Sequence, residues 1–245
     1  MSDPFVHHPE LLDQIKAPET SLFWDFNIEN FRDILLAHGG AVDWWYSDDE
    51  REAMRAETMA GRLTDPLWVF GYGSLMWDPA FPFSEVRRAH LKGFERQFTL
   101  VEVHGARGTP EAPGLVAALD RGDECDGLAF RIEGSNVDLA TEKIWRRERI
   151  AGGYKPVFVS VRTAKGELEA LTFVADHSAE AIEPELTFDE QARMMATGAG
   201  MLGSSLDYLK GVAEHLSALG IEDPHVSELL AAAENLRSKN EVENG

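Results

Sequence analysis

The sequence predicts an α+β fold built around a curled or barrel-like sheet. Short segments rich in β-branched and aromatic residues follow one another from residue 67 to about 175. Repeated strand-helix units are missing from this region, which argues against a doubly wound parallel sheet. Beyond residue 185 the spacing of apolar residues becomes helical. We therefore expect one strand-rich core, with helices before and after it.

The chain divides into a helical extension packed on the core, residues 1–66, and a main domain, residues 67–245. Ser47-Asp48-Asp49-Glu50 is a capping box, which predicts a helix through about Leu63 that stops before Asp65-Pro66. The extension is too aromatic for a disordered tail, so it should pack on other residues. Its aromatic residues include Phe23, Trp24, Phe26, Phe31, Trp44 and Trp45.

Alternating side chains predict that the strands pair in antiparallel fashion. The expected strands are Leu67 to Phe70, Leu91 to Val101, Gly114 to Asp120, Gly127 to Ile132, and the runs Val157-x-Val159-x-Val161 and Leu171-x-Phe173 around a turn at Ala164-Lys165-Gly166. A single helix interrupts them, from a cap at Ser135 or Asn136 to Gly152-Gly153.

The C-terminal region predicts three helices. Thr187-x-x-Glu190 opens the first, and Asp223-Pro224 opens the last. The middle helix ends at Gly220 and has an apolar stripe formed by Leu206, Leu209, Val212, Ala213, Leu216 and Leu219.

Composition limits the function classes. The 245 residues carry a formal charge of −20, which disfavours binding to nucleic acid or to an anionic membrane by general attraction. The single cysteine, Cys125, cannot form an internal disulfide, and no apolar run resembles a signal peptide or a spanning helix. Neither His-Glu-x-x-His nor paired Cys-x-x-Cys occurs, so no metal site is expected. We expect a cytoplasmic protein.

The stretch Val69-Phe70-Gly71-Tyr72-Gly73-Ser74-Leu75-Met76 is the first candidate for function. An apolar strand runs into two glycines, and such a turn can offer backbone N–H groups to a carboxylate or phosphate. The alternative is a tight turn with a buried tyrosine. The third glycine of a dinucleotide fingerprint is replaced by Met76, and Ser74 lacks a nucleophile elbow. Both interpretations of the stretch stay open at this point, and in neither is Ser74 expected to be a nucleophile.

Glu148 is the second candidate. It follows Ile144 by four residues and Trp145 by three, so helical geometry places its carboxylate over an apolar face. One interpretation is an ion pair with Arg147 or another arginine near the helix end. The other is a general base, because burial would raise the pKa of the carboxyl group toward neutrality.

Several motifs together resemble the ChaC family of γ-glutamylcyclotransferases over roughly residues 44 to 230. They are Phe70-Gly71-Tyr72-Gly73-Ser74-Leu75-Met76-Trp77, Arg107-Gly108-Thr109-Pro110 with Pro113-Gly114, Trp145-Arg146-Arg147-Glu148, Gly153-Tyr154-x-Pro156, and Tyr208-Leu209. They occur in order and at suitable spacing. Residues 1–43 lie outside the resemblance.

The resemblance implies a γ-glutamylcyclotransferase-like mixed β-barrel with helices around it, and cleavage of glutathione to 5-oxoproline and cysteinylglycine without a metal or cofactor. Glu148 matches the catalytic glutamate, and residues 67–245 become the catalytic domain. Arg107 and Tyr208 match positions near the substrate, although the arginine could be solvated and the tyrosine could simply pack. The matching substrate-binding loop comprises Val69, Phe70, Gly71, Tyr72, Gly73, Ser74 and Leu75.

One departure from the family concerns Ser205, which stands where relatives often have asparagine. Substrate preference therefore stays open. The alternatives are a cyclotransferase for other γ-glutamyl amines and a non-catalytic binding or regulatory module linked to cation transport. The sequence does not determine the oligomeric state.

Overall fold

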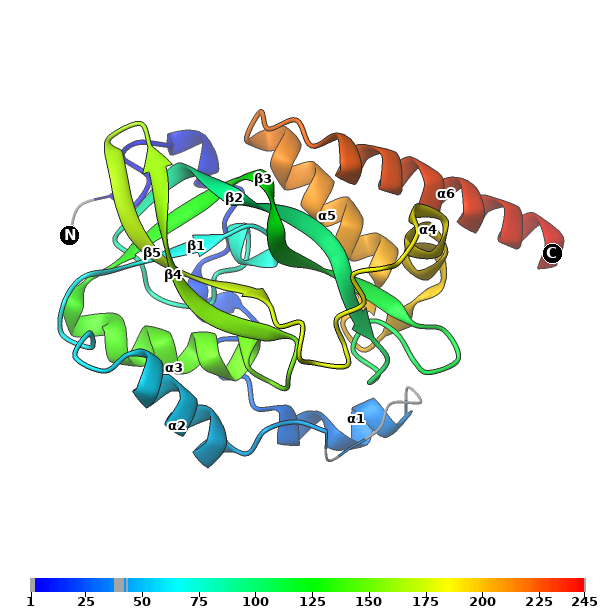
Figure 1. Ribbon diagram of the computed structural model, residues 1–245, viewed down its shortest axis with the longest axis horizontal. Coiled ribbons are helices and arrows are strands. Elements are labelled where there is room, and N and C mark those ends of the chain that lie inside the picture. The colour runs from blue at the N-terminus through cyan, green and yellow to red at the C-terminus, as the bar shows by residue number, and fades with distance from the viewer. Residues whose placement is uncertain (1–2, 38–41, 43, 245) are drawn as a thin grey trace. The chain divides into compact units, whose positions relative to one another are not determined.

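A computed structural model describes residues 3–37, 42 and 44–244 of the chain, with side chains up to residue 239 (Figure 1). Residues 38–41 and 43 of the predicted extension lie outside the described residues. Five strands form a closed barrel in the order β1-β3-β2-β4-β5. They are β1 (Leu67–Gly71), β2 (Glu85–Glu102), β3 (Gly114–Ile132), β4 (Tyr154–Thr163) and β5 (Gly166–Ala175).

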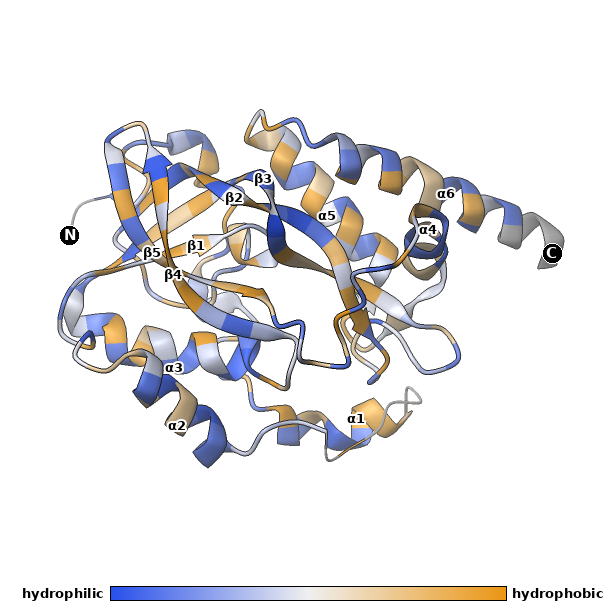
Figure 2. Cartoon of the chain, in the orientation of Figure 1, coloured by the Kyte–Doolittle hydropathy of each residue, from blue (hydrophilic) through white to orange (hydrophobic). Residues whose placement is uncertain are grey.

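The pairing of the barrel is mixed. β1 pairs antiparallel with β3, and β4 pairs antiparallel with β5 along its whole length, as the alternation of polar and apolar residues predicts (Figure 2). β5 also runs parallel to β1, with Val69 opposite Leu171, and parallel to β3, with Leu119 opposite Val174. The parallel contacts are not among the antiparallel pairs that the alternation predicted, because they join strands that do not belong to one hairpin, and the mixed β-barrel implied by the family resemblance is confirmed.

Strand β3 corrects a second prediction. The segments Gly114 to Asp120 and Gly127 to Ile132 belong to one continuous strand, Gly114–Ile132. The polar residues 121–126 between them look like a loop in the sequence. They continue the strand with most of their side chains exposed or partly exposed, while Cys125 is buried. A polar segment can stay extended where its backbone is paired and its side chains face water.

The chain forms two compact units, each assembled from three segments. Unit 1 comprises Met1–Asn27, Trp45–Arg96 and Leu119–Ala175, and unit 2 comprises Ile28–Trp44, Gln97–Ala118 and Asp176–Gly245. Strands β2 and β3 each contribute residues to both units. The predicted division of the chain after residue 66 stays a prediction.

The core of unit 1 is aromatic. Phe70, Phe81, Phe130, Phe173 and Trp145 are almost completely buried. The rings of Phe81 and Phe130 meet edge to face at 5.8 Å, and those of Trp145 and Phe173 do so at 5.3 Å. Trp145 belongs to helix α3 (Val137–Glu148), so this helix contributes a large ring to the core close to its C-terminal end.

Helix α2 (Asp48–Thr58) begins at the predicted capping box, in which the Ser47 hydroxyl accepts from the Glu50 N–H and the Glu50 carboxylate accepts from the Ser47 N–H. It ends at Thr58 rather than near Leu63, since the chain turns there and Gly61 has a positive φ of 73°. α2 packs on α3, where Arg55 donates to Asp138 at 2.8 Å.

Helix α3 also ends earlier than predicted. Its last residue is Glu148, and Arg149 leaves the helical conformation with φ −117° and ψ 41°. The glycines at 152 and 153 therefore belong to the following turn, where Gly153 has φ 123°. No side chain caps the N-terminus of α3, although Asn136 occupies the cap position.

The helices of unit 2 follow the predicted order. They are the short α1 (Arg32–Ala37), then α4 (Phe188–Thr197), α5 (Ser205–Ala218) and α6 (Pro224–Asn244), with a small ribbon of β6 (Ala199–Gly200) and β7 (Gly203–Ser204) before α5. α4, α5 and α6 pack against one another. Capping boxes open α4 at Thr187 and Glu190, as predicted, and α5 at Ser204 and Asp207, which the sequence analysis missed.

None of the helices within the described residues combines the length and the apolar character that crossing a bilayer requires.

Candidate active site

The loop after β1 has little freedom. Val69 and Phe70 are fully buried, and Gly71 is followed by one 3-10 turn, Ser74–Met76. A Cβ on Gly71 would lie 2.9 Å from Cβ of Leu75, closer than side chains normally approach. Glycine is therefore required at residue 71 for the turn to fold back on the strand.

Tyr72 anchors this loop. It is buried, and its hydroxyl donates to the carbonyl of Phe173 at 2.9 Å. The carbonyl of Tyr72 accepts from Nε of Arg96 at 2.7 Å, and the same guanidinium donates to the carbonyl of Asp126 at 2.8 Å. The turn with a buried tyrosine is confirmed, and it holds the backbone of residues 71–73 in a fixed place.

Ser74 joins the loop to helix α3. Its Oγ accepts from Nη2 of Arg147 at 2.7 Å, and its carbonyl accepts from the N–H of Asp78 at 2.9 Å. A guanidinium only donates, so this contact supplies no base for the hydroxyl proton. That Ser74 is not a nucleophile stays a prediction.

Glu148 is the last residue of α3, and only 13% of its side chain is exposed. Burial raises the pKa of this carboxyl group, while the guanidinium of Arg147, with Nε 3.1 Å from Oε1, acts in the opposite direction. Both interpretations of Glu148 thus describe a real feature, since the ion pair and the desolvated carboxylate occur together. A buried carboxylate whose pKa is raised suits proton transfer near neutral pH.

Arg107 and Tyr208 lie together in unit 2. The guanidinium of Arg107 lies 5.0 Å from the centroid of the Tyr208 ring, and its Nη1 donates to the carbonyl of Ser204 at 3.1 Å. Tyr208 is buried, and its hydroxyl accepts from the N–H of Ala117 at 3.3 Å. Arg107 is therefore held in place by a hydrogen bond and by the ring of Tyr208. Tyr208 is a packed, buried residue that also contacts the guanidinium of Arg107.

Glu102 holds the Arg107 loop, a role that the sequence analysis did not assign. Its carboxylate accepts from the backbone N–H groups of His104 at 2.6 Å, Arg107 at 2.6 Å and Gly108 at 2.7 Å. The ring of His104 stacks on Trp44 at 4.0 Å, and burial lowers the pKa of this histidine. An acidic residue just before a glycine-containing turn was the available signal in the sequence.

Ser205, the departure from the family pattern, is completely buried. Its Oγ accepts from the N–H of Leu115 at 3.0 Å and donates to the carbonyl of Arg107 at 3.2 Å. The serine thus ties the start of α5 to both ends of the segment 107–115. A Cβ on Gly114 would overlap with this hydroxyl, so the backbone at Gly114 comes this close to Ser205 only because glycine has no side chain.

The structure therefore brings the predicted residues together in two groups. In unit 1, the loop 69–75 and Glu148 are joined through Arg147, which the sequence indicated only as a possible ion-pair partner of Glu148. In unit 2, Arg107 and Tyr208 are in contact. No group of three or more metal-ligating side chains occurs among the described residues.

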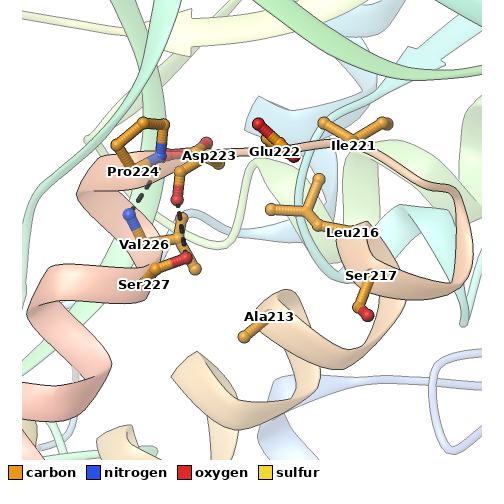
Figure 3. A pocket seen from close by; sticks show the side chains of 9 residues that line it. All are labelled: Ala213, Leu216, Ser217, Ile221, Glu222, Asp223, Pro224, Val226 and Ser227. Atoms are coloured by element: carbon orange, nitrogen blue, oxygen red, sulfur yellow. Dashed lines mark hydrogen bonds between the residues drawn. The ribbon is translucent and has the colours of Figure 1, made fainter.

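A pocket of about 340 Å³ lies elsewhere in unit 2, where α5 turns into α6 (Figure 3). It contains none of the predicted site residues. Asp223 organises the turn, since its carboxylate accepts from the N–H of Val226 at 3.1 Å and its carbonyl accepts from the hydroxyl of Ser227 at 3.0 Å. The lining residues are Ala213, Leu216, Ser217, Ile221, Glu222, Asp223, Pro224, Val226 and Ser227.

Comparison with known proteins identifies the family. The model of ChaC-like proteins matches residues 67–236, a range that contains the loop, Arg107, Glu148 and Tyr208. The chain belongs to the ChaC-like family. A glutathione-specific γ-glutamylcyclotransferase of Escherichia coli (strain K12) is 32% identical over 197 residues, covering 80% of this chain and 85% of the relative.

Other relatives agree with this assignment. Glutathione-specific γ-glutamylcyclotransferase 1 of Homo sapiens is 30% identical over 173 residues, covering 68% of this chain and 78% of the relative. A crystal structure of a yeast γ-glutamylcyclotransferase specific to glutathione superposes with a TM-score of 0.65 at 23% identity, covering 71% of this chain and 97% of the other. This likeness confirms the α+β barrel fold of the ChaC-like chain.

Proposed function

We propose that this protein cleaves glutathione into 5-oxoproline and cysteinylglycine, with Glu148 as general base and general acid. The observation that carries the proposal is the buried Glu148 carboxylate, linked through Arg147 to Ser74 of the glycine loop. The names of the bacterial and human relatives support glutathione as the substrate.

The reaction needs no nucleophile from the protein. The free α-amine of the γ-glutamyl group attacks its own γ-carbonyl carbon, a C–N bond closes the five-membered lactam, and the C–N bond to the cysteine nitrogen breaks. The attack is intramolecular, so its entropic cost falls once the γ-glutamyl chain is held folded. The expectation that Ser74 is not a nucleophile fits this chemistry.

Two proton transfers accompany these bond changes. An α-amine has a pKa of about 8 and is mostly protonated near neutral pH. The ammonium form first releases one proton to solvent, and Glu148 then takes the proton that the nitrogen loses as the lactam bond forms and returns it to the departing cysteinylglycine amine. Because burial raises the pKa of Glu148, its carboxylate is a stronger base than that of an exposed glutamate, which favours the transfer from the amine.

We assign substrate binding to the loop Val69–Leu75, and to Arg107 and Tyr208. The fixed backbone of the loop supplies N–H donors, which either hold the γ-glutamyl group or stabilise the oxyanion that develops on the γ-carbonyl. The formal charge of −20 repels an anionic peptide at long range, so attraction depends on local groups such as Arg107. We place residues 67–245 as the catalytic domain, and the protein in the cytoplasm.

The test is incubation of the purified full-length protein with glutathione, followed by mass spectrometry for 5-oxoproline and cysteinylglycine. We expect both products from the wild type and from Glu142→Gln, and none from Glu148→Gln. Glu142 is the matched control because it lies on the same helix and its side chain is half exposed. Its carboxylate Oε1 lies 2.9 Å from Nη2 of Arg146.

The outcomes separate three functions. Faster turnover of simple γ-glutamyl amino acids than of glutathione would replace the substrate and keep the reaction class. Binding of glutathione without product from any γ-glutamyl compound would indicate a binding module. Full activity of Glu148→Gln would remove Glu148 from the mechanism.

A further inference from the structure

Arg147 makes contacts on every side of its guanidinium group. Nη2 donates to Oγ of Ser74 at 2.7 Å, Nη1 donates to the carbonyl of Asp78, and Nε lies 3.1 Å from Oε1 of Glu148. Its side chain is only 6% exposed. This arginine therefore fixes the distance between the loop that begins at β1 and the carboxylate at the end of α3.

The fourth contact comes from the N-terminal segment, here residues 16–24. The ring of Phe23 covers the face of the Arg147 guanidinium, with 4.3 Å between Cζ and the ring centroid. Phe23 itself packs against Phe26, which is buried. Stacking on an aromatic face leaves all guanidinium N–H groups free to donate in the plane.

The N-terminal segment also holds the second partner of Arg147. Nζ of Lys16 lies 3.1 Å from Oδ2 of the buried Asp78, and the N–H of Lys16 donates to the carbonyl of Trp77 at 2.9 Å. Trp24 covers Nζ of Lys143 on α3 at 4.0 Å. Residues 16–24 therefore touch both the chain that follows the glycine loop and the helix that carries Glu148.

We propose that the N-terminal segment is a positioning element of the active site, in which Phe23 holds Arg147 so that Arg147 aligns Glu148 with the glycine loop. The proposal rests on the proposed function for the role of Glu148. It extends the site to residues outside 67–236, the range matched by the family model. Phe23 and Lys16 do not touch the reacting atoms in this proposal; they act through Arg147.

The physical basis is the exclusion of water from an ion pair. A charge pair in a water-excluded site keeps a fixed geometry, and the apolar ring of Phe23 removes the solvent that would compete for the guanidinium. Removing the ring opens the guanidinium to water, and the attraction by which Arg147 lowers the pKa of Glu148 is then weakened.

Other charged groups around this ion pair are engaged elsewhere. Asp78 faces Arg147 and is paired with Lys16. Arg149, on the side of α2, donates to the carbonyl of Tyr154 and lies over the ring of Tyr46 at 5.3 Å. Among the described side chains that act on Glu148, Arg147 supplies the opposing charge.

The experiment compares Phe23→Ala with Phe23→Tyr and Phe5→Ala in the full-length protein. Phe23→Tyr keeps an aromatic face over Arg147. Phe5→Ala removes a buried ring from the same N-terminal region, but this ring packs on Phe83, with 5.8 Å between the centroids. Activity with glutathione is measured across pH. In parallel, the carboxyl carbon of Glu148 is followed by NMR in ¹³C-glutamate-labelled protein, and Glu148→Gln identifies the signal.

We expect Phe23→Ala to lower kcat by about 3- to 10-fold, the loss of one partly desolvated cation-π contact. KM should change less than twofold, because Phe23 does not contact the substrate in this proposal. The acid limb of the pH profile and the titration of the Glu148 carboxyl should both move to higher pH, because the guanidinium that lowers the pKa of Glu148 acts on it less strongly. Phe23→Tyr should restore wild-type values, and Phe5→Ala should leave the pH profile and the titration in place.

The proposal is overturned if Phe23→Ala keeps the wild-type kcat and titration, or if Phe5→Ala reproduces its effects, since general destabilisation would then explain them. A wild type without activity on any γ-glutamyl compound refutes the proposed function instead. The titration of Glu148 then decides the positioning role by itself: a shift in Phe23→Ala alone supports it, and no shift overturns it.

Discussion

Replacing Ser205 by alanine removes two buried hydrogen bonds at once. The N–H of Leu115 loses its acceptor at 3.0 Å, and the carbonyl of Arg107 loses a donor at 3.2 Å. Ser205 and Leu115 are both fully buried, so solvent does not reach the orphaned N–H. We expect the variant to show whether this serine orders the Arg107 loop or merely occupies space.

The magnitude follows from the unpaired donor. A buried N–H without a partner costs about 1–3 kcal/mol, so we take about 2 kcal/mol for Ser205→Ala. For a protein of this size, 1 kcal/mol corresponds to about 2–4 °C in the melting temperature. The variant should therefore melt about 4–8 °C below the wild type. KM for glutathione should rise with it, because the segment that carries Arg107 loses one of its ties.

Thermal unfolding by calorimetry and steady-state kinetics measure the two effects. Ser178→Ala is the control, because this exposed serine also donates a side-chain hydrogen bond, to Asp176 at 2.8 Å. An exposed change of this kind is worth at most about 0.5 kcal/mol, which is below about 2 °C. If Ser205→Ala melts within about 1 °C of the wild type, the two hydrogen bonds do not stabilise unit 2 and the reasoning is wrong.

Two further predictions concern unit 1. Gly71→Ala places a methyl group 2.9 Å from Cβ of Leu75, so the loop must shift; we expect KM to rise more than kcat falls, and an unchanged KM would contradict a binding role for this loop. For Glu148, burial raises the folded-state pKa above the ordinary 4.5, so the folded protein holds this proton more tightly than the unfolded chain and stability falls as pH rises from about 4.5 through the folded pKa. Glu148→Gln cannot ionise at this position, so it does not lose stability in this way. Its free energy of unfolding, measured by urea denaturation, should therefore increase relative to that of the wild type as pH rises. A difference between the two proteins that is independent of pH would show that burial does not act on this carboxylate.

Local signals explain what the sequence predicted well. The capping boxes at Ser47 and Thr187 depend on residues three apart, and the helical position of Glu148 depends on residues three and four apart. The glycine loop was recognisable because a strand, two glycines and a serine follow each other directly. Within these short distances the chain has little choice of conformation.

Features that depend on distant partners could not be predicted in the same way. The polar residues 121–126 stay extended because other strands of the barrel pair with β3, which the sequence alone does not show. Arg147 was taken as one possible partner of Glu148, but its bonds to Ser74 and Asp78 span about 70 residues of chain. The contact of Phe23 with Arg147 spans even more, and the N-terminal segment gave no motif from which to infer it.

The assembly of each unit from three chain segments affects how the protein is made. Unit 1 draws its last segment from residues up to Ala175, whereas unit 2 needs residues from Asp176 onward. A ribosome adding 5–20 residues per second takes about 4–14 s for the remaining 70 residues. During this interval unit 1 has all its residues, while the part of β2 and β3 that belongs to unit 2 waits for its helices. These strand ends are the segments that a chaperone would have to shield from aggregation during synthesis.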